Sequence, residues 1–320
     1  MSTSNLLTIK GGFWRLLLIV VLYLAACLLP FAGMLFVLTL PALMFLLSFY
    51  NGWVKTMNAL FVAIVAIFAI LSFTHTYFPL IVPAAVGFSG MVMARSIRLN
   101  PPVEALILLP SLVCLTAIAA FFVLSGIQLE MNVVEVVKKY LADAVDLNIS
   151  FYARLPLKPE EIKAIQDSRD GVIELLARIF PAICTISVLS VIWLNVLLAG
   201  KILGKKSITP PVFLGLSQWR TPVWLVWVFI TAGVMMVFSH THLRFAGINI
   251  FLITAFFYLL QGLAIISFFF QSKNVSMFFR VIIYFLIAVQ QLLMIAVAAV
   301  GLFDLWVDFR KYFRKDQATG

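Results

Sequence analysis

Four side-chain amides lie inside otherwise apolar stretches of this sequence: Asn195, Gln261, Gln290 and Gln291. In hydrocarbon an amide needs a hydrogen-bond partner or must line a cavity. One interpretation is that these side chains bond neighbouring helices to one another. The other is an apolar pocket in which a few amides orient a small, uncharged ligand, and it makes the four amides the candidate ligand-binding residues.

Four charged residues lie within about two helical turns near the C-terminus: Asp304, Asp308, Arg310 and Lys311. Asp308 and Lys311 are spaced i, i+3 and can pair, whereas the carboxylates of Asp304 and Asp308 are spaced i, i+4 and repel. One interpretation is an interfacial anchor with Trp306 at the headgroup level. The alternative is a partner-docking handle formed by the four charged residues.

A histidine pair, His240 and His242, lies in the connection "SHTHLR", and His75 falls on the same face in the topology below. Such a pair can ligate a metal, but a solvated turn explains it more simply. We therefore predict no metal site.

Motifs for nucleotide, zinc or acyl chemistry are absent from the sequence: it contains no GxxxxGK[ST], HExxH or GxSxG. "GFSG" at Gly87 to Gly90 resembles a hydrolase core only loosely, and its glycines are typical of close helix packing, as is Ala94. We expect no cofactor, no catalytic residue and no enzymatic activity. The lack of ionisable groups deep in the apolar runs also argues against a proton relay.

Composition indicates an integral membrane protein. Of the 320 residues 63% are hydrophobic and 11% charged, and the mean hydropathy is +1.10. The net charge of +10 is distributed in short clusters between apolar runs, which favours retention at the cytoplasmic face over nucleic-acid binding. The three cysteines lie in apolar runs without CxxC spacing and are typical of small core residues.

Nine apolar runs approach the length of a membrane span, so we expect an all-α polytopic transmembrane bundle of eight or nine spans. The first run should remain in the mature protein, because no short polar region with a small-residue cleavage site follows it. The runs are Trp14 to Phe31, Met34 to Tyr50, Ala59 to Phe73, Tyr77 to Met93, Val103 to Ile127, Val172 to Ala199, Val223 to Phe238, Phe245 to Phe270 and Phe278 to Leu302.

Positive residues between the runs place the N-terminus in the cytoplasm, if the first six runs all cross. The basic residues on that face are Lys10, Arg15, Lys55, Arg95, Arg98, Lys201, Lys205, Lys206 and Arg220. Nine crossings would put the basic tail, from Arg310 to Lys315, outside, against the same rule. We favour an inside tail with one of the last three runs not crossing, and the short run Val223 to Phe238 is the first candidate; an outside tail is the alternative.

The connection from Gln128 to Gly171 is predicted to lie outside, and it holds eight of the thirteen acidic residues. Apolar residues recur at helical spacing from Val133 to Val145, which predicts an amphipathic helix. A second helix should begin at Pro159, followed by acidic residues in its first turn. The two helices either rest on the membrane surface or form a lid. The predicted domains are therefore 1–127, a five-span bundle; 128–171, the extracytoplasmic segment; 172–302, a C-terminal bundle; and 303–320, a basic tail.

Several stretches resemble the YybS-like family of bacterial polytopic membrane proteins. They are "IFPAICTISVLSVIWLNVLLAGKIL" (179–203), "LSQWRTPVWLVW" (216–227), "FFYLLQGLAIISFFF" (256–270) and "GLFDLWVDFRK" (301–311). That family is similar in fold to the substrate-binding S components of energy-coupling-factor transporters. The resemblance implies a bacterial plasma-membrane subunit that captures a small molecule and depends on a separate ATPase module. The first helix lacks the Ala-x-x-x-Ala docking motif of such components, and the number of spans exceeds theirs.

Two functions follow as hypotheses. The first is a membrane subunit that binds or transports a small molecule without its own ATPase, and the alternative is a membrane scaffold that organises other envelope proteins. The partners expected are membrane lipid and either other membrane proteins or a separate ATPase module, and no nucleic acid. The sequence does not indicate an oligomeric state.

Overall fold

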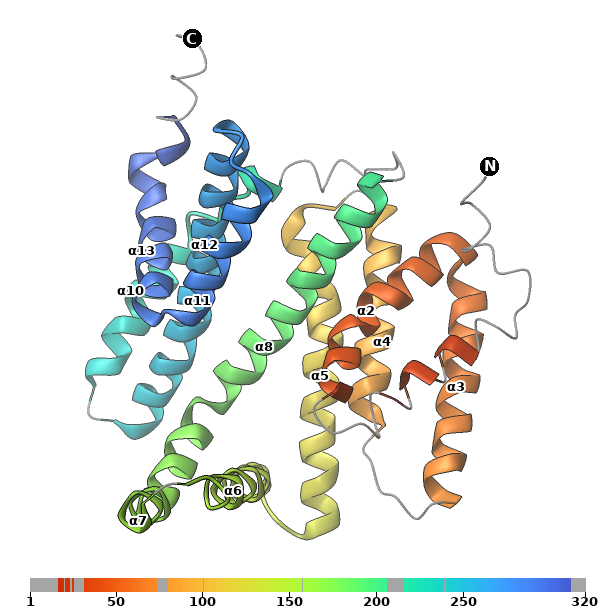
Figure 1. Cartoon of the computed structure of the whole chain (residues 1–320), viewed down its shortest axis with the longest axis vertical. Helices are drawn as coiled ribbons and strands as arrows, with labels where there is room; N and C mark the ends of the chain where they lie inside the picture. Colours follow the sequence, from red (N-terminus) through yellow and green to blue (C-terminus); the bar gives the residue numbers. More distant parts are fainter. Residues whose placement is uncertain are drawn as a thin grey trace. The chain divides into compact units, whose positions relative to one another are not determined.

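The structure, a computed structural model, describes residues 17–19, 21–23, 25, 32–73, 80–99, 101–156, 158–205, 216–238 and 240–311. Its regular elements in these ranges are all helices, with no strand (Figure 1). The predicted all-α class is therefore confirmed. Most of the first apolar run, His75, Lys206 and the end of the tail lie outside the described residues.

The helices whose bounds the structure describes before the polar connection are α2 (Ala32–Asn51), α3 (Trp53–Phe73), α4 (Ile81–Ile97) and α5 (Val103–Leu129). They correspond to the second to fifth apolar runs. Gly52 separates α2 from α3 with φ +88°, a left-handed conformation that only glycine adopts without strain. The guanidinium of Arg98 after α4 donates to the carbonyl of Phe49 near the end of α2, so these two helices end on the same side of their bundle.

Helices α6 (Val133–Tyr152) and α7 (Pro159–Asp167) form the polar connection and confirm both predicted helices. A capping box starts α6: the Glu135 N–H donates to Asn132 Oδ1 and the Asn132 N–H donates to Glu135 Oε2, both at 2.9 Å. In the second half of α6, Asp146 accepts hydrogen bonds on both carboxylate oxygens from the guanidinium of Arg169, at 2.6 and 2.7 Å. This hydrogen bonding lowers the pKa of Asp146 below its usual value.

The C-terminal part consists of α8 (Arg169–Lys205), the short helix η2 (Leu216–Gln218), α10 (Leu225–Val237), α11 (Thr241–Ser272), α12 (Met277–Val289) and α13 (Gln291–Val307). Helix α8 is the longest of the described helices, with 37 residues. The last predicted run, Phe278 to Leu302, is wrong as a single helix. It is divided at Gln290 into α12 and α13, whose axes are bent by 103°.

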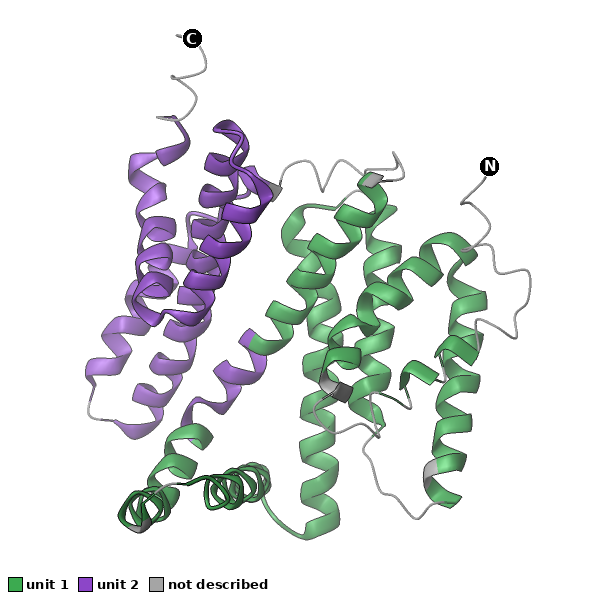
Figure 2. Cartoon of the chain, in the orientation of Figure 1, with its two compact units in different colours: residues 1–177, 187–213 green, residues 178–186, 214–320 purple. Residues whose placement is uncertain are grey.

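The chain divides into two compact units (Figure 2). Unit 1 comprises residues 1–177 and 187–213, and unit 2 comprises residues 178–186 and 214–320. Helix α8 contributes residues to both units, and the polar connection belongs to unit 1. The four predicted domains stay a prediction.

Four described helices are long and apolar enough to cross a membrane: α3, α5, α8 and α11. The number rises to five if α12 and α13 together form one bent span. Helices α2, α4 and α10 include apolar segments of 17, 17 and 13 residues, which are shorter. A multi-pass membrane protein is therefore supported, whereas eight or nine crossings stay a prediction.

Glycines set the close helix contacts in each unit, as the sequence predicted for Gly87 and Gly90. In unit 1 a Cβ placed on Gly90 would collide with the backbone carbonyl of Pro41 in α2. In unit 2 Gly262 of α11 lies against Val297, and Gly301 of α13 lies against the carbonyl of Tyr258. Small residues of this kind let helix backbones approach in a membrane, where lipid offers no hydrophobic driving force.

Candidate functional site

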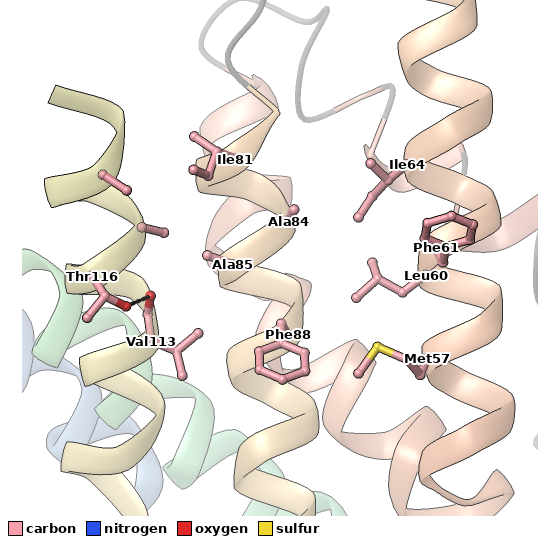
Figure 3. A pocket seen from close by; sticks show the side chains of 12 residues that line it. Met57, Leu60, Phe61, Ile64, Ile81, Ala84, Ala85, Phe88, Val113 and Thr116 are labelled. Atoms are coloured by element: carbon pink, nitrogen blue, oxygen red, sulfur yellow. Dashed lines mark hydrogen bonds between the residues drawn. The ribbon is translucent and has the colours of Figure 1, made fainter. Parts of the chain in front are cut away.

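Unit 1 contains an apolar groove between α3, α4 and α5, with a volume of about 530 Å³ (Figure 3). Each helix contributes four side chains to it. The alanine side chains of α4 and α5 leave the groove open, and the larger side chains of α3 line it on the other side. The lining residues are Met57, Leu60, Phe61, Ile64, Ile81, Ala84, Ala85, Phe88, Val113, Thr116, Ala117 and Ala120.

The chemistry of this groove is uniformly apolar. Its one polar side chain, Thr116, donates its hydroxyl to the carbonyl of Val113 in its own helix at 2.9 Å. No ionisable residue lines it. A groove of this volume is in the range of small-molecule sites, and its lining favours an apolar molecule held by contact area over one recognised by charge.

Unit 2 contains a buried polar network at the C-terminal end of α13, which we call the C-terminal clasp: Trp219, Thr221, Gln261, Asp304 and Arg310. The Gln261 amide is fully buried and bonds two elements. Its Oε1 accepts from the Thr221 backbone N–H at 3.0 Å and from the Thr221 hydroxyl, and its Nε2 donates to Asp304 Oδ2 at 3.0 Å.

Asp304 and Arg310 form the charged centre of the clasp, with relative exposures of 0% and 1%. Arg310 Nη1 donates to Asp304 Oδ2 at 2.9 Å, and Arg310 Nη2 donates to the carbonyl of Trp219 at 2.9 Å. Asp304 Oδ1 accepts from the backbone N–H of Phe309 at 3.0 Å. A buried charge pair of this kind persists only when hydrogen bonds offset its desolvation, and here both carboxylate oxygens of Asp304 and both Nη groups of Arg310 are hydrogen-bonded.

Three further charged residues lie outside the clasp. Arg220 pairs with Asp308, and Lys311 lies 3.8 Å from Asp308 with its side chain 76% exposed. The predicted i, i+3 pair is therefore present. The predicted repulsion between Asp304 and Asp308 is offset, because Arg310 pairs with Asp304, while Arg220 pairs with Asp308 and lies 3.9 Å from Asp304 Oδ2.

The structure thus brings together one predicted ligand-binding amide, Gln261, with the predicted docking residues. Asp304 and Arg310 are turned inward, so only Asp308 and Lys311 of that set reach the surface. A docking role for the four charged residues stays a prediction. Thr221 and the carbonyl of Trp219 were not anticipated, because nothing in their local sequence marks them as partners of residues 40 and 91 positions away.

The remaining predicted amides lie elsewhere. Asn195 is buried in unit 1, where it bonds to the backbone of α2. Gln290 and Gln291 lie exposed at the junction of α12 and α13. None of the four amides lines the groove, and their ligand-binding role stays a prediction.

The described residues contain no group of three or more His, Cys, Asp or Glu side chains placed to hold a metal ion. His240 is the residue before α11 and His242 lies in its first turn, both exposed.

Comparison with known proteins gives one match. A family model described as a predicted membrane protein, DUF2232, matches residues 17–305. No curated protein and no solved structure matches the chain. The YybS-like name and the likeness to S components stay predictions.

Proposed function

Because the chain belongs to the DUF2232 family of predicted membrane proteins, we propose that it is a membrane subunit that binds or transports a small, largely apolar molecule without an ATPase of its own. The groove between α3, α4 and α5 is the observation that carries this proposal. It offers a space lined by side chains, whereas the buried amides Asn195 and Gln261 are hydrogen-bonded within the protein. An S-component-like role with a separate ATPase module fits the same site.

Groove-filling substitutions test the proposal. Ala117 of α5 lines the groove, whereas Ala119 of the same helix is exposed and does not. The wild type, Ala117→Trp and Ala119→Trp are purified from the membrane in mild detergent, and the small molecules released on denaturation are identified by mass spectrometry. We expect one apolar molecule enriched in the wild type and in Ala119→Trp, and lost from Ala117→Trp.

Equal recovery of every small molecule from the three proteins would contradict the binding role. Recovery of bulk phospholipid alone, in all three, would show that the groove is an ordinary lipid-facing depression. Proteins that copurify in the same experiment are identified in parallel, since a stoichiometric ATPase supports transport.

We also infer that the chain crosses the membrane eight times, with both termini in the cytoplasm and α12–α13 as a re-entrant hairpin. Arg280 in the first turn of α12 donates to the carbonyl of Phe270 near the end of α11. Arg310, just after α13, bonds to Trp219, which follows η2, and η2 packs on α11. Within unit 2 the start of α12 and the end of α13 therefore both lie toward the C-terminal end of α11 (Figure 1).

This topology changes which run fails to cross. The sequence first suggested that the short run Val223 to Phe238 does not cross. In the proposed topology this run, which contains α10, crosses together with the segment before it, and the last run enters and leaves the membrane on the same side. Lys273, Arg280 and the basic tail then share one side, as the positive-inside rule favours. Single cysteines at Lys273 and at Lys315 should react with a membrane-impermeant reagent from the same side, and reaction from opposite sides would contradict the hairpin.

The scaffold function remains a second candidate because the clasp fixes the segment around residue 310 and presents Lys311 at the surface. Envelope-assembly proteins recovered without any enriched small molecule would favour it. A Lys311→Glu variant should then lose those proteins, while the groove variants keep them.

A further inference from the structure

Two helices of this protein contain an internal proline followed by alanine, and both are bridged by an asparagine from another helix. Proline lacks the backbone N–H and pushes away the carbonyl of the preceding turn, so a helix bends there. In α2 this proline is Pro41. The Ala42 N–H donates to Asn195 Oδ1 at 2.8 Å, and Asn195 Nδ2 donates to the carbonyl of Leu38 at 2.8 Å. Leu38 and Ala42 are the pair that a regular helix joins directly.

The second bridge has the same register on different helices. In α8 this proline is Pro181. The Ala182 N–H donates to Asn249 Oδ1 at 2.8 Å, and Asn249 Nδ2 donates to the carbonyl of Arg178 at 2.8 Å. Arg178 and Ala182 are again four residues apart.

Each bridging asparagine is also fixed to its own helix in the same way. Asn195 Nδ2 donates to the carbonyl of Val191 at 2.7 Å, and Asn249 Nδ2 donates to the carbonyl of Phe245 at 2.8 Å. Both acceptors lie four residues before the asparagine. The alanine after each proline is buried, at 3% for Ala42 and 0% for Ala182, which leaves room for the amide to reach the backbone.

Proline alone does not call for such a bridge in this chain. Pro110 lies inside α5, and there the neighbouring carbonyl of Ile107 accepts from the hydroxyl of Ser111, a residue of the same helix, at 2.8 Å. Local repair of this kind leaves a helix independent of its neighbours. The asparagine bridges instead tie the bend of α2 to α8 and the bend of α8 to α11.

We propose that Asn195 and Asn249 are paired hinge locks, which hold α2 and α8 bent at Pro41 and Pro181 and release them when the amide withdraws. Helix α8 supplies the lock Asn195 to α2 and is itself held at Pro181, 14 residues earlier, by Asn249 of α11. Withdrawal of the amide lets the Leu38 carbonyl and the Ala42 N–H, or the Arg178 carbonyl and the Ala182 N–H, bond to each other. Each helix thus has two arrangements that differ by an exchange of hydrogen bonds. The proposal does not depend on the ligand of the groove.

Distances between spin labels across each bend test the locks in the full-length protein in detergent or lipid. Labels at Leu35 and Asn51 flank Pro41, and labels at Leu175 and Leu194 flank Pro181. Straight helices would separate the two pairs of Cα atoms by roughly 24 and 29 Å, from the rise per residue. We expect Asn195→Leu to add a longer-distance population to the first pair, and Asn249→Leu to do so in the second.

Asn148→Leu is the matched control, because the Asn148 amide donates to the carbonyl of Ala144 within its own helix. It should leave both distance distributions at their wild-type values. Pro41→Ala should shift the first pair to one longer distance, and adding Asn195→Leu to Pro41→Ala should cause no further change.

Wild-type distributions in both asparagine variants would overturn the locks. If Asn195→Leu does not accumulate in the membrane, Pro41→Ala decides for α2, since an unchanged distance there would also contradict the proposal.

Discussion

Unit 1 and unit 2 use polar side chains in different ways around the features that define them. In unit 2 the clasp buries an aspartate and an arginine together and bonds them to an amide, a carbonyl and a backbone N–H. In unit 1 the groove is lined by hydrocarbon, and its one hydroxyl is engaged within its own helix. The comparison teaches that a polar residue in an apolar run of this protein marks a place where the backbone or a neighbouring helix is held, while the open space is found where polar residues are missing.

The largest effect should come from breaking the charged centre of the clasp. Asp304→Ala leaves Arg310 buried without its carboxylate, and we expect a loss of about 3–5 kcal/mol in the free energy of unfolding. Replacing both residues, as Asp304→Leu with Arg310→Met, should cost less than either single change, because no uncompensated charge remains. Thermal unfolding in detergent measures both.

Lys311→Ala is the control for the clasp, since this side chain is exposed and its ion pair lies at the surface. It should change stability by less than about 1 kcal/mol. A double variant that is less stable than both single variants would contradict this prediction, because the two residues would then contribute to stability separately and not mainly by compensating each other's charge.

A smaller effect is expected where unit 1 depends on close packing. Gly90→Ala places a methyl group against the carbonyl of Pro41, which forces α4 away from α2 and should cost about 1–3 kcal/mol. Gly171→Ala is the matched change in open space, and there alanine should be neutral or stabilising by up to about 1 kcal/mol. Equal thermal stability of the two variants would refute the close contact.

The smallest effect concerns the surface pair of Asp146 and Arg169. The pKa of Asp146 is lower in the folded protein than the usual 3.8, so its carboxylate stabilises the fold above that pH. The contribution is lost as the pH falls below 3.8 through the folded pKa. The melting temperatures of the wild type and Asp146→Asn should therefore differ at pH 7 and converge at low pH. Asp143→Asn is the control on the same helix, because Asp143 forms no ion pair among the described residues.

Much of the helical framework was predictable because apolar runs and caps are local signals. The amphipathic helix α6, with Asn132 before it and Glu135 in its first turn, and α7, with Pro159 as its first residue, follow from short stretches of sequence. The break at Gln290 was not predicted, since "IAVQQLLMIA" has neither proline nor glycine and its hydropathy continues across the bend.

The partners of the polar residues were beyond local reasoning. Asn195 was recognised as an amide in an apolar run, but its partner Leu38 is 157 residues away and contributes only a backbone carbonyl, which every residue has. Asn249 carried the same signal and was missed; the recurrence of Pro-Ala in α2 and α8 was the available clue. The sequence did not indicate the groove, because its lining residues, such as Ala84 and Ala117, are of the same types as those of any lipid-facing helix surface.

The distance along the chain between α2 and its bridging asparagine also has a consequence for biosynthesis. Ala42 leaves the ribosome 153 residues before Asn195. At about 5–20 residues per second, α2 spends roughly 8–30 s in or near the translocon before its bridge can form. Until Asn195 is synthesised, the Leu38 carbonyl and the Ala42 N–H can bond only to each other, so a chain truncated before Asn195 should keep α2 in the arrangement without the bridge.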